Sequence, residues 1–96
     1  MYKIHKRALA EKDIKNIWLY TYEQWGETQA DRYYDELEYG IKSLGHNPHL
    51  GKKRDTLRQG YYAFTINRHV VYYRVEASTI HIIRVLHECM DPAQHL

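Results

Sequence analysis

The segment Ile80–Asp91, IHIIRVLHECMD, is the most apolar run of the chain and decides how the rest of it must fold. Its short length, its β-branched residues and the polar residues that end it predict a buried central strand. Arg84 lies in the middle of this run. A guanidinium stays charged, so it must reach solvent, a carboxylate or a concave site. The segment therefore predicts both the centre of the core and a candidate functional face.

Two further strands are predicted directly upstream. Apolar and polar residues alternate along Tyr61–Ile66 and His69–Val75, and Asn67-Arg68 is expected to form the tight turn between them. Ala77-Ser78 turns the chain back into the last strand. We therefore expect a three-stranded antiparallel meander.

The first half of the chain predicts one strand and two amphipathic helices. Tyr2–Lys6 is expected to be a short strand, at a sheet edge or paired with the C-terminal strands. Apolar residues at three- and four-residue steps predict helices from about residue 7 or 8 to Trp25 and from about residue 27 or 28 to Gly45. A connection this short makes the helices antiparallel neighbours, and their apolar faces need a sheet to cover.

The predicted fold class is therefore α+β, with the helical hairpin on one face of an antiparallel sheet. The 96 residues suffice for one domain, residues 1–96. Residues 46–60 are expected to be a polar loop and residues 90–96 a short tail.

Composition indicates the cellular location of the protein and the charge of its partners. No apolar stretch approaches the roughly 20 residues that span a bilayer, and the N-terminus has no apolar signal region, so no membrane association is expected. Cys89 is the single cysteine, which excludes an internal disulfide and favours a reducing, cytoplasmic location. Residues 51–96 carry 7 Lys and Arg against 4 Asp and Glu. This mildly basic half is compatible with an acidic protein partner or an RNA backbone.

The motifs of catalytic and metal sites are missing. The seven histidines lack metal-ligand spacing, and there is neither a serine elbow nor a glycine-rich phosphate loop, so no metal or cofactor is predicted. What remains is a group of cations and polar rings on the predicted sheet: Arg58, Arg68, Arg74, Arg84, His69, His87 and Tyr73. Such a group can stabilise the charge of a phosphodiester being cleaved, dock an acidic partner segment, or simply pair with local carboxylates such as Glu76.

Several short motifs resemble those of one known family. They are Trp25-Gly26, Ala30 with Tyr33, Asn47-Pro48 with Gly51, Arg58 before Gly60-Tyr61, HVVYYR at 69–74, Ile82, RVLH at 84–87 and Met90-Asp91. Together they resemble the ParE toxins of the RelE/ParE superfamily of bacterial toxin–antitoxin and plasmid-stabilisation systems. The resemblance covers nearly the whole chain, and RVLH followed by Met-Asp is its most specific part.

The resemblance implies the RelE/ParE-like fold, a ParD-like antitoxin as partner, and poisoning of DNA gyrase, with its A subunit as the target. It implies neither direct sequence-specific DNA binding nor enzymatic activity. We expect target or partner contacts from Arg58, Arg74, Arg84 and His87. We expect antitoxin contacts from Trp18, Tyr22, Tyr33 and Tyr73.

The alternative is a RelE-like, ribosome-dependent mRNA endonuclease. In that case Lys52, Lys53, Arg58 and Arg84 would stabilise charge, and His87 would act as acid or base. No tyrosine follows Arg84, however, and the C-terminal segment has the ParE pattern. The sequence therefore favours gyrase poisoning without hydrolytic chemistry.

Overall fold

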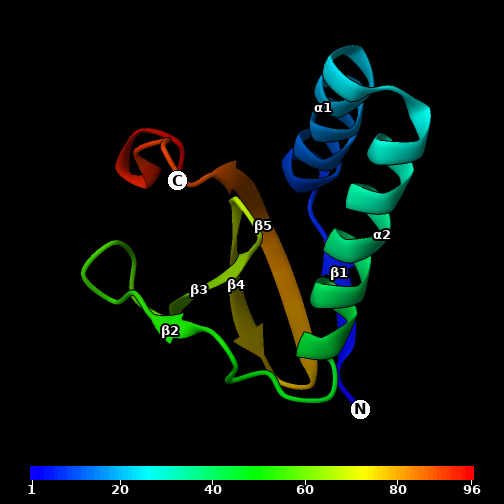
Figure 1. The fold of residues 1–96 in the computed structure, drawn as a ribbon. Coiled ribbons are helices and arrows are strands. Elements are labelled where there is room, and N and C mark those ends of the chain that lie inside the picture. Colours follow the sequence, from blue (N-terminus) through cyan, green and yellow to red (C-terminus); the bar gives the residue numbers. More distant parts are fainter.

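The computed structural model describes residues 1–96 and has two layers, a helical hairpin and a five-stranded sheet (Figure 1). The hairpin consists of α1 (Ala8–Trp25) and α2 (Glu27–Leu44). The strands are β1 (Lys3–Lys6), β2 (Lys52–Lys53), β3 (Tyr61–Ile66), β4 (His69–Glu76) and β5 (Thr79–His87), and a 3-10 turn, η1 (Pro92–Gln94), follows. Neither helix combines the length and the apolar character needed to cross a membrane.

The sheet order is β1-β5-β4-β3-β2. The predicted meander is confirmed, because β3, β4 and β5 pair antiparallel. The expectation of a purely antiparallel sheet is wrong, since β1 pairs parallel with β5 from Lys3 opposite Thr79 to Lys6 opposite Ile82. Side-chain alternation shows which face a residue occupies but carries no information about the direction of the neighbouring strand.

The predicted loop of residues 46–60 contains a strand that the sequence did not reveal. In β2, Lys52 and Lys53 pair antiparallel with Ala63 and Tyr62 of β3. Two exposed lysines are too short a segment to show a period. They also leave this edge of the sheet short and charged, which discourages pairing with another chain.

A register shift in the middle of the sheet places the core residues of β5. Tyr72 of β4 lies opposite Arg84, whereas the next residue, Tyr73, lies opposite Ile82. The bulge leaves Ile83 as an extra residue of β5. Because of this extra residue, Ile82 and Val85 both join the core, although strict alternation would put them on opposite faces.

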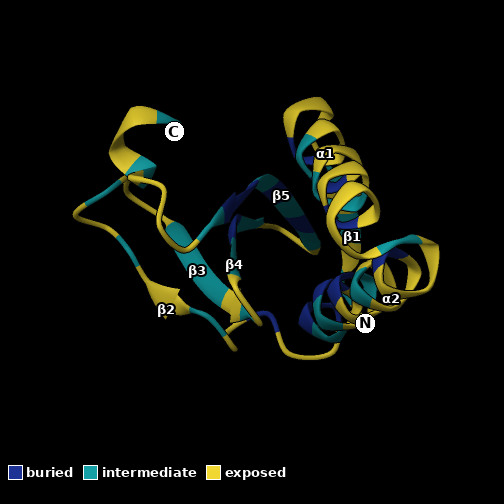
Figure 2. Ribbon diagram, turned by 45° about the horizontal axis from the view of Figure 1, so that its top comes forward, coloured by how far each residue is buried: buried dark blue, intermediate teal, exposed yellow.

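The core lies between the hairpin and the sheet, and Figure 2 shows its buried residues on the sides of the elements that face each other. Its members are Ala10, Ile14, Leu37, Ile41, Leu44, Val71, Tyr73, Ile80, Ile82 and Val85. Trp25, the last residue of α1, is 67% exposed. The end of the hairpin extends past the sheet, so the last turn of α1 has no strand to cover (Figure 1).

Tyr73 fixes the long loop to the sheet. Its hydroxyl donates to the Pro48 carbonyl at 2.8 Å and accepts from the Gly51 amide at 3.0 Å. A Cβ at Gly51 would lie 2.8 Å from this hydroxyl and 2.9 Å from the Ala63 carbonyl, so only glycine fits there. Tyr73 itself is fully buried, so a partner cannot touch its side chain. The predicted antitoxin contact at Tyr73 is therefore corrected to a core residue that anchors the loop.

Candidate partner-binding groove

A groove of about 1390 Å³ opens where the hairpin extends past the sheet. It is lined by the second half of α1, the start of α2, the β3–β4 turn, the end of β5 and the C-terminal tail. The groove contains three of the residues predicted from the sequence, Tyr33, Arg84 and His87. It is the largest concave surface that collects predicted site residues, and we take it as the candidate functional site.

The helical wall of the groove presents aromatic rings that the chain itself leaves uncovered. Tyr20 is 60% exposed and Trp25 is 67% exposed, and their rings meet edge to face at a centroid distance of 6.4 Å. Met90 of the tail, 38% exposed, also lines the groove. Uncovered aromatic and thioether side chains in a concavity are typical of a surface that binds another macromolecule.

Tyr33 of α2 and His69 of β4 connect the two layers across the groove. The Tyr33 hydroxyl lies 2.5 Å from His69 Nδ1 and accepts from the Arg68 amide at 3.3 Å. The hydroxyl keeps its own proton while it accepts from that amide, so it can donate to Nδ1 of a neutral His69. Burial, and then the neighbouring His87, lower the pKa of His69 to about 4, and burial raises the pKa of Tyr33.

His87 closes this polar cluster at the end of β5. Its ring stands perpendicular to that of His69 at a centroid distance of 5.3 Å. His87 Nδ1 accepts from the Cys89 amide at 3.1 Å, so the backbone after the strand orients the imidazole. The two histidines therefore form a fixed pair rather than two free side chains.

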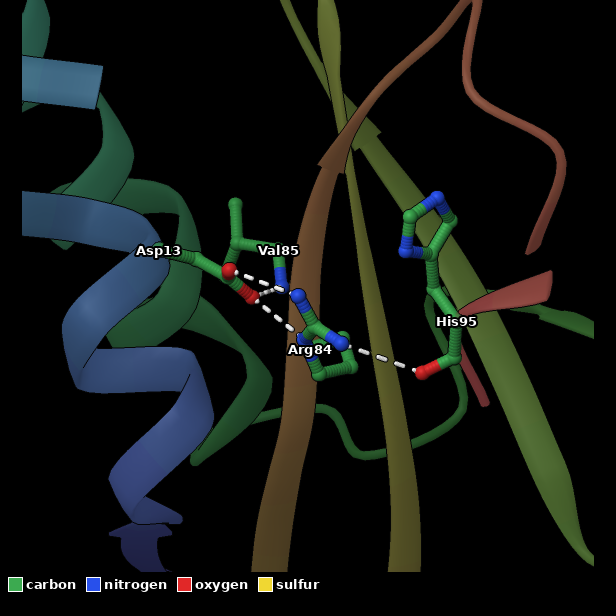
Figure 3. A network of polar contacts seen from close by, with 4 residues as sticks. All are labelled: Asp13, Arg84, Val85 and His95. Atoms are coloured by element: carbon green, nitrogen blue, oxygen red, sulfur yellow. Dashed lines mark hydrogen bonds and ion pairs between the residues drawn. The ribbon is translucent and has the colours of Figure 1, made fainter. Parts of the chain in front are cut away.

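Arg84 lies at the edge of the groove and binds three segments together (Figure 3). Its Nε and Nη2 donate to the two carboxylate oxygens of Asp13 in α1, at 2.8 and 2.9 Å. Its Nη1 donates to the carbonyl of His95 in the tail at 3.1 Å. The hydrogen bond from Asp13, followed by its negative charge, raises the pKa of Arg84. Each of the three guanidinium nitrogens therefore donates a hydrogen bond within the protein.

Asp13 has a second task at the edge of the sheet. β1 ends at Lys6, opposite Ile82, so the outer edge of β5 has no strand partner beyond that point. Asp13 Oδ2 accepts the Val85 amide at 3.0 Å and thereby replaces one missing ladder bond. Pairing of Arg84 with a local carboxylate such as Glu76 was one of the alternatives left open by the sequence, and the structure pairs it with Asp13 of α1. Glu76 pairs with Arg74 instead, at 3.5 Å.

The structure separates the remaining predicted residues. Arg58 is exposed in the loop before β3, and Arg74 lies in β4 with Glu76. Trp18 donates to Asp31 at 2.9 Å and stacks on the exposed Tyr22, so this pair forms a different surface of the hairpin.

Sequence reasoning missed Asp13 and the exposure of Trp25. Asp13 lies three residues after the buried Ala10 and next to the buried Ile14, so an acid borders the apolar side of α1. That position was a signal, because a carboxylate there needs a donor from the layer below. Trp25 offered no such signal, since its exposure depends on how far the hairpin extends past the sheet. Tyr20 did offer one, because it falls off the apolar stripe of α1 and was therefore a plausible part of a partner surface on the hairpin.

Comparison with known proteins identifies a family for this arrangement. A family model described as "ParE toxin of type II toxin-antitoxin system, parDE" matches residues 2–92. Toxin ParE1 of Caulobacter vibrioides is 39% identical over 95 residues, which cover 99% of this chain and 96% of the relative. Toxin ParE1 of Mycobacterium tuberculosis is 38% identical over 88 residues, 91% of this chain and 90% of the relative.

Solved structures share the fold at lower sequence identity. A chain of the chromosomal ParDE system of P. aeruginosa superposes with a TM-score of 0.80 at 19% identity, covering 91% of this chain and 96% of that one. A chain of the RelBE2 toxin–antitoxin complex of M. tuberculosis gives a TM-score of 0.67 at 18% identity, covering 90% and 96%. The hairpin-on-sheet architecture is therefore common to both.

Removing the Asp13 carboxylate should destabilise the fold. Asp13→Ala leaves a half-buried guanidinium without its anion and the Val85 amide without its acceptor. We expect a loss of about 2 to 4 kcal/mol in the free energy of unfolding, between the costs of an unpaired amide and of a broken buried ion pair. Urea unfolding measures it. Asp35→Ala, at an exposed position of α2, is the matched control and should stay within about 0.5 kcal/mol of wild type. An equal loss in both variants would contradict this account of Asp13.

Acid should weaken the fold through His69. Its pKa is about 4 in the folded chain and has the ordinary value of about 6.5 in the unfolded chain. Below about pH 6.5 the unfolded state binds the extra proton, so stability falls as the pH falls toward about 4. Urea midpoints from about pH 7 to about 4.5 should therefore fall more for wild type than for His69→Gln, whose amide oxygen can still accept from Tyr33. His46→Gln, at an exposed position, should follow wild type, and identical acid losses in all three proteins would exclude the role of His69.

Proposed function

The chain belongs to the ParE family of toxins of type II toxin–antitoxin systems, and from that premise we propose that it acts by binding two macromolecules in the cytoplasm: a ParD-like antitoxin and DNA gyrase. The observation that supports a binding role most directly is the groove, with its uncovered aromatic rings and its engaged arginine. The uncovered rings support binding of an antitoxin, and the engaged arginine supports action on gyrase without catalysis.

The groove is proposed as the binding site of an antitoxin segment. Its helical wall offers Tyr20 and Trp25, large apolar rings with little conformational entropy to lose on binding. A segment that folds on binding would cover these rings and bury the surface that the isolated toxin leaves exposed. The structural neighbour described as the toxin–antitoxin complex RelBE2 agrees with an antitoxin as the partner.

The A subunit of gyrase is proposed as the target, poisoned without any bond being broken by the toxin. A nuclease needs a free cation to stabilise the charge that develops on the phosphate. Of the two arginines that line the groove, Arg84 already binds Asp13 and the His95 carbonyl, and Arg68 lies in the exposed β3–β4 turn. Lys52, Lys53 and Arg58 are exposed in β2 and the following loop and do not line the groove. The His69–His87 pair is the one feature that favours the nuclease alternative, since imidazoles can exchange protons with a substrate.

Shortening the aromatic wall should weaken antitoxin binding. Trp25→Ala and Tyr20→Ala remove exposed rings and leave the core intact. We expect each to raise the Kd for the antitoxin encoded beside the toxin by about 10- to 100-fold, as for interface hot spots. Calorimetric titration measures the change. Tyr39→Ala, on α2 outside the groove and 79% exposed, is the matched control and should leave the Kd unchanged. An equal effect at Tyr39 would rule out the groove as the site.

The purified toxin should inhibit gyrase and leave RNA intact. We expect it to block supercoiling and to trap cleaved DNA on gyrase, and we expect antitoxin to reverse both effects. Transcript ends mapped after induction should show no cuts within codons. Normal supercoiling together with codon-specific cutting that His87→Ala abolishes would reject gyrase and favour the ribosome-dependent nuclease.

A further inference from the structure

The open face of the sheet, opposite the hairpin, carries a row of polar rings and a cation that the groove does not use. His5 of β1 pairs with His81 of β5, His81 with Arg74 of β4, and Arg74 with Tyr61 of β3. The four side chains therefore follow one line across four strands. The chain neighbours Ile4, Ile80, Ile82, Tyr73 and Tyr62 pack in or against the hairpin core, so alternation turns this row to the other face.

The row has more donors than acceptors. His5 and His81 meet edge to face at a centroid distance of 5.7 Å. Glu76 lies 3.5 Å from Arg74 Nη2 and 3.8 Å from His81 Nε2 and is the only carboxylate paired with the row. Arg74 Nε and His81 Nδ1 are covered by protein yet have no hydrogen-bond partner. Groups of this kind usually find a partner in a folded protein, and the Arg74 side chain, which is 38% exposed, can turn its guanidinium toward an acceptor on this face.

The charged side chains around the row are mostly positive, like Arg74 within it. Lys3 lies two residues before His5 in β1, and Lys52 lies opposite Ala63, two residues after Tyr61, so both share this face. Arg54 lies close to the Tyr72 hydroxyl, as does Asp91. Lys3, Lys52, Arg54 and Arg74 thus give this face four permanent cations, against two carboxylates, Glu76 and Asp91. A surface with this balance attracts polyanions.

We propose that this open face binds single-stranded DNA through its phosphodiester backbone. Neighbouring strands lie about 4.8 Å apart, so the row spans about 14 Å and can reach more than one phosphate of an extended strand. Cations and backbone-directed donors supply affinity without reading sequence, and Tyr61 offers a ring face for a base. The face is a pleated surface with no helix to enter a duplex groove, so it suits a single strand better than a double helix.

The choice of DNA over RNA rests on the proposed function, because gyrase acts on DNA. The row and the cations around it share no residue with the lining of the groove, so antitoxin in the groove and DNA on the open face do not compete for the same side chains. The two proposals can therefore fail separately. A toxin that inhibits gyrase without binding DNA overturns only the proposal of DNA binding. A toxin that binds DNA but leaves gyrase unaffected overturns only the proposal of gyrase poisoning.

Fluorescence anisotropy with a labelled, mixed-sequence strand of about 20 nucleotides tests the proposal on the full-length toxin. We expect affinity for single-stranded DNA to exceed that for the duplex and to fall steeply from about 50 to about 200 mM salt. Arg74→Gln and Lys3→Gln should each weaken binding about 3- to 10-fold and reduce the salt slope by about 0.7. Circular dichroism melting verifies that each variant remains folded.

Arg32→Gln is the matched control, because it removes the same charge from an exposed position of α2 on the other side of the molecule. Its binding should match wild type within about 2-fold. An equal loss in Arg32→Gln would mean that net charge alone attracts the strand and would overturn the proposal. Tighter binding of an RNA strand of the same length, or displacement of DNA by polyglutamate at lower concentration than by unlabelled DNA, would also overturn it.

Discussion

A permanent positive charge in β5 is the constraint on which the rest of this structure depends. Arg84 cannot lose its proton, and it lies beside the core in the second strand of the sheet, beyond the point where the edge strand β1 ends. Its bidentate pairing with Asp13 satisfies the charge and at the same time fixes α1 against β5. The same carboxylate accepts the amide of Val85, where β1 has already ended. One ion pair therefore closes the open end of the sheet and holds the tail through the His95 carbonyl.

The bulge at Ile83 makes this arrangement possible. It lets Ile82 and Val85 both pack under the hairpin. Arg84, between the bulge and Val85, extends its guanidinium around the uncovered edge of β5 to α1. The core and the cation thus occupy the same strand without competing for the same space. Tyr73, one residue past the shift in β4, uses its hydroxyl in a similar way, since it satisfies loop backbone at Pro48 and Gly51 from inside the core.

The molecule offers two chemically different surfaces on the two sides of one sheet. The side under the hairpin ends in a groove with exposed aromatic rings and a neutral Tyr33–His69 pair, which suits an apolar protein segment. The other side carries cations and imidazoles in a row, which suits a polyanion. Because the hairpin covers only one face, a toxin of this size can contact two partners at once without a second domain.

The sequence alone determined the features that depend on local periodicity. Spacing and turn chemistry predict both helices, their stops at Gly26 and Gly45, the antiparallel meander and most of the core. Arg84 was also correctly marked as a residue that needs a partner, since a charge inside an apolar strand must be satisfied. Only the tertiary structure decided which partner, because Asp13 is 71 residues away and its role depends on where β1 ends. The same holds for the parallel pairing of β1, for β2, for the burial of Tyr73 and for the exposure of Trp25. Each of these depends on how layers and strand ends meet in space, a relation between distant segments that no local period encodes.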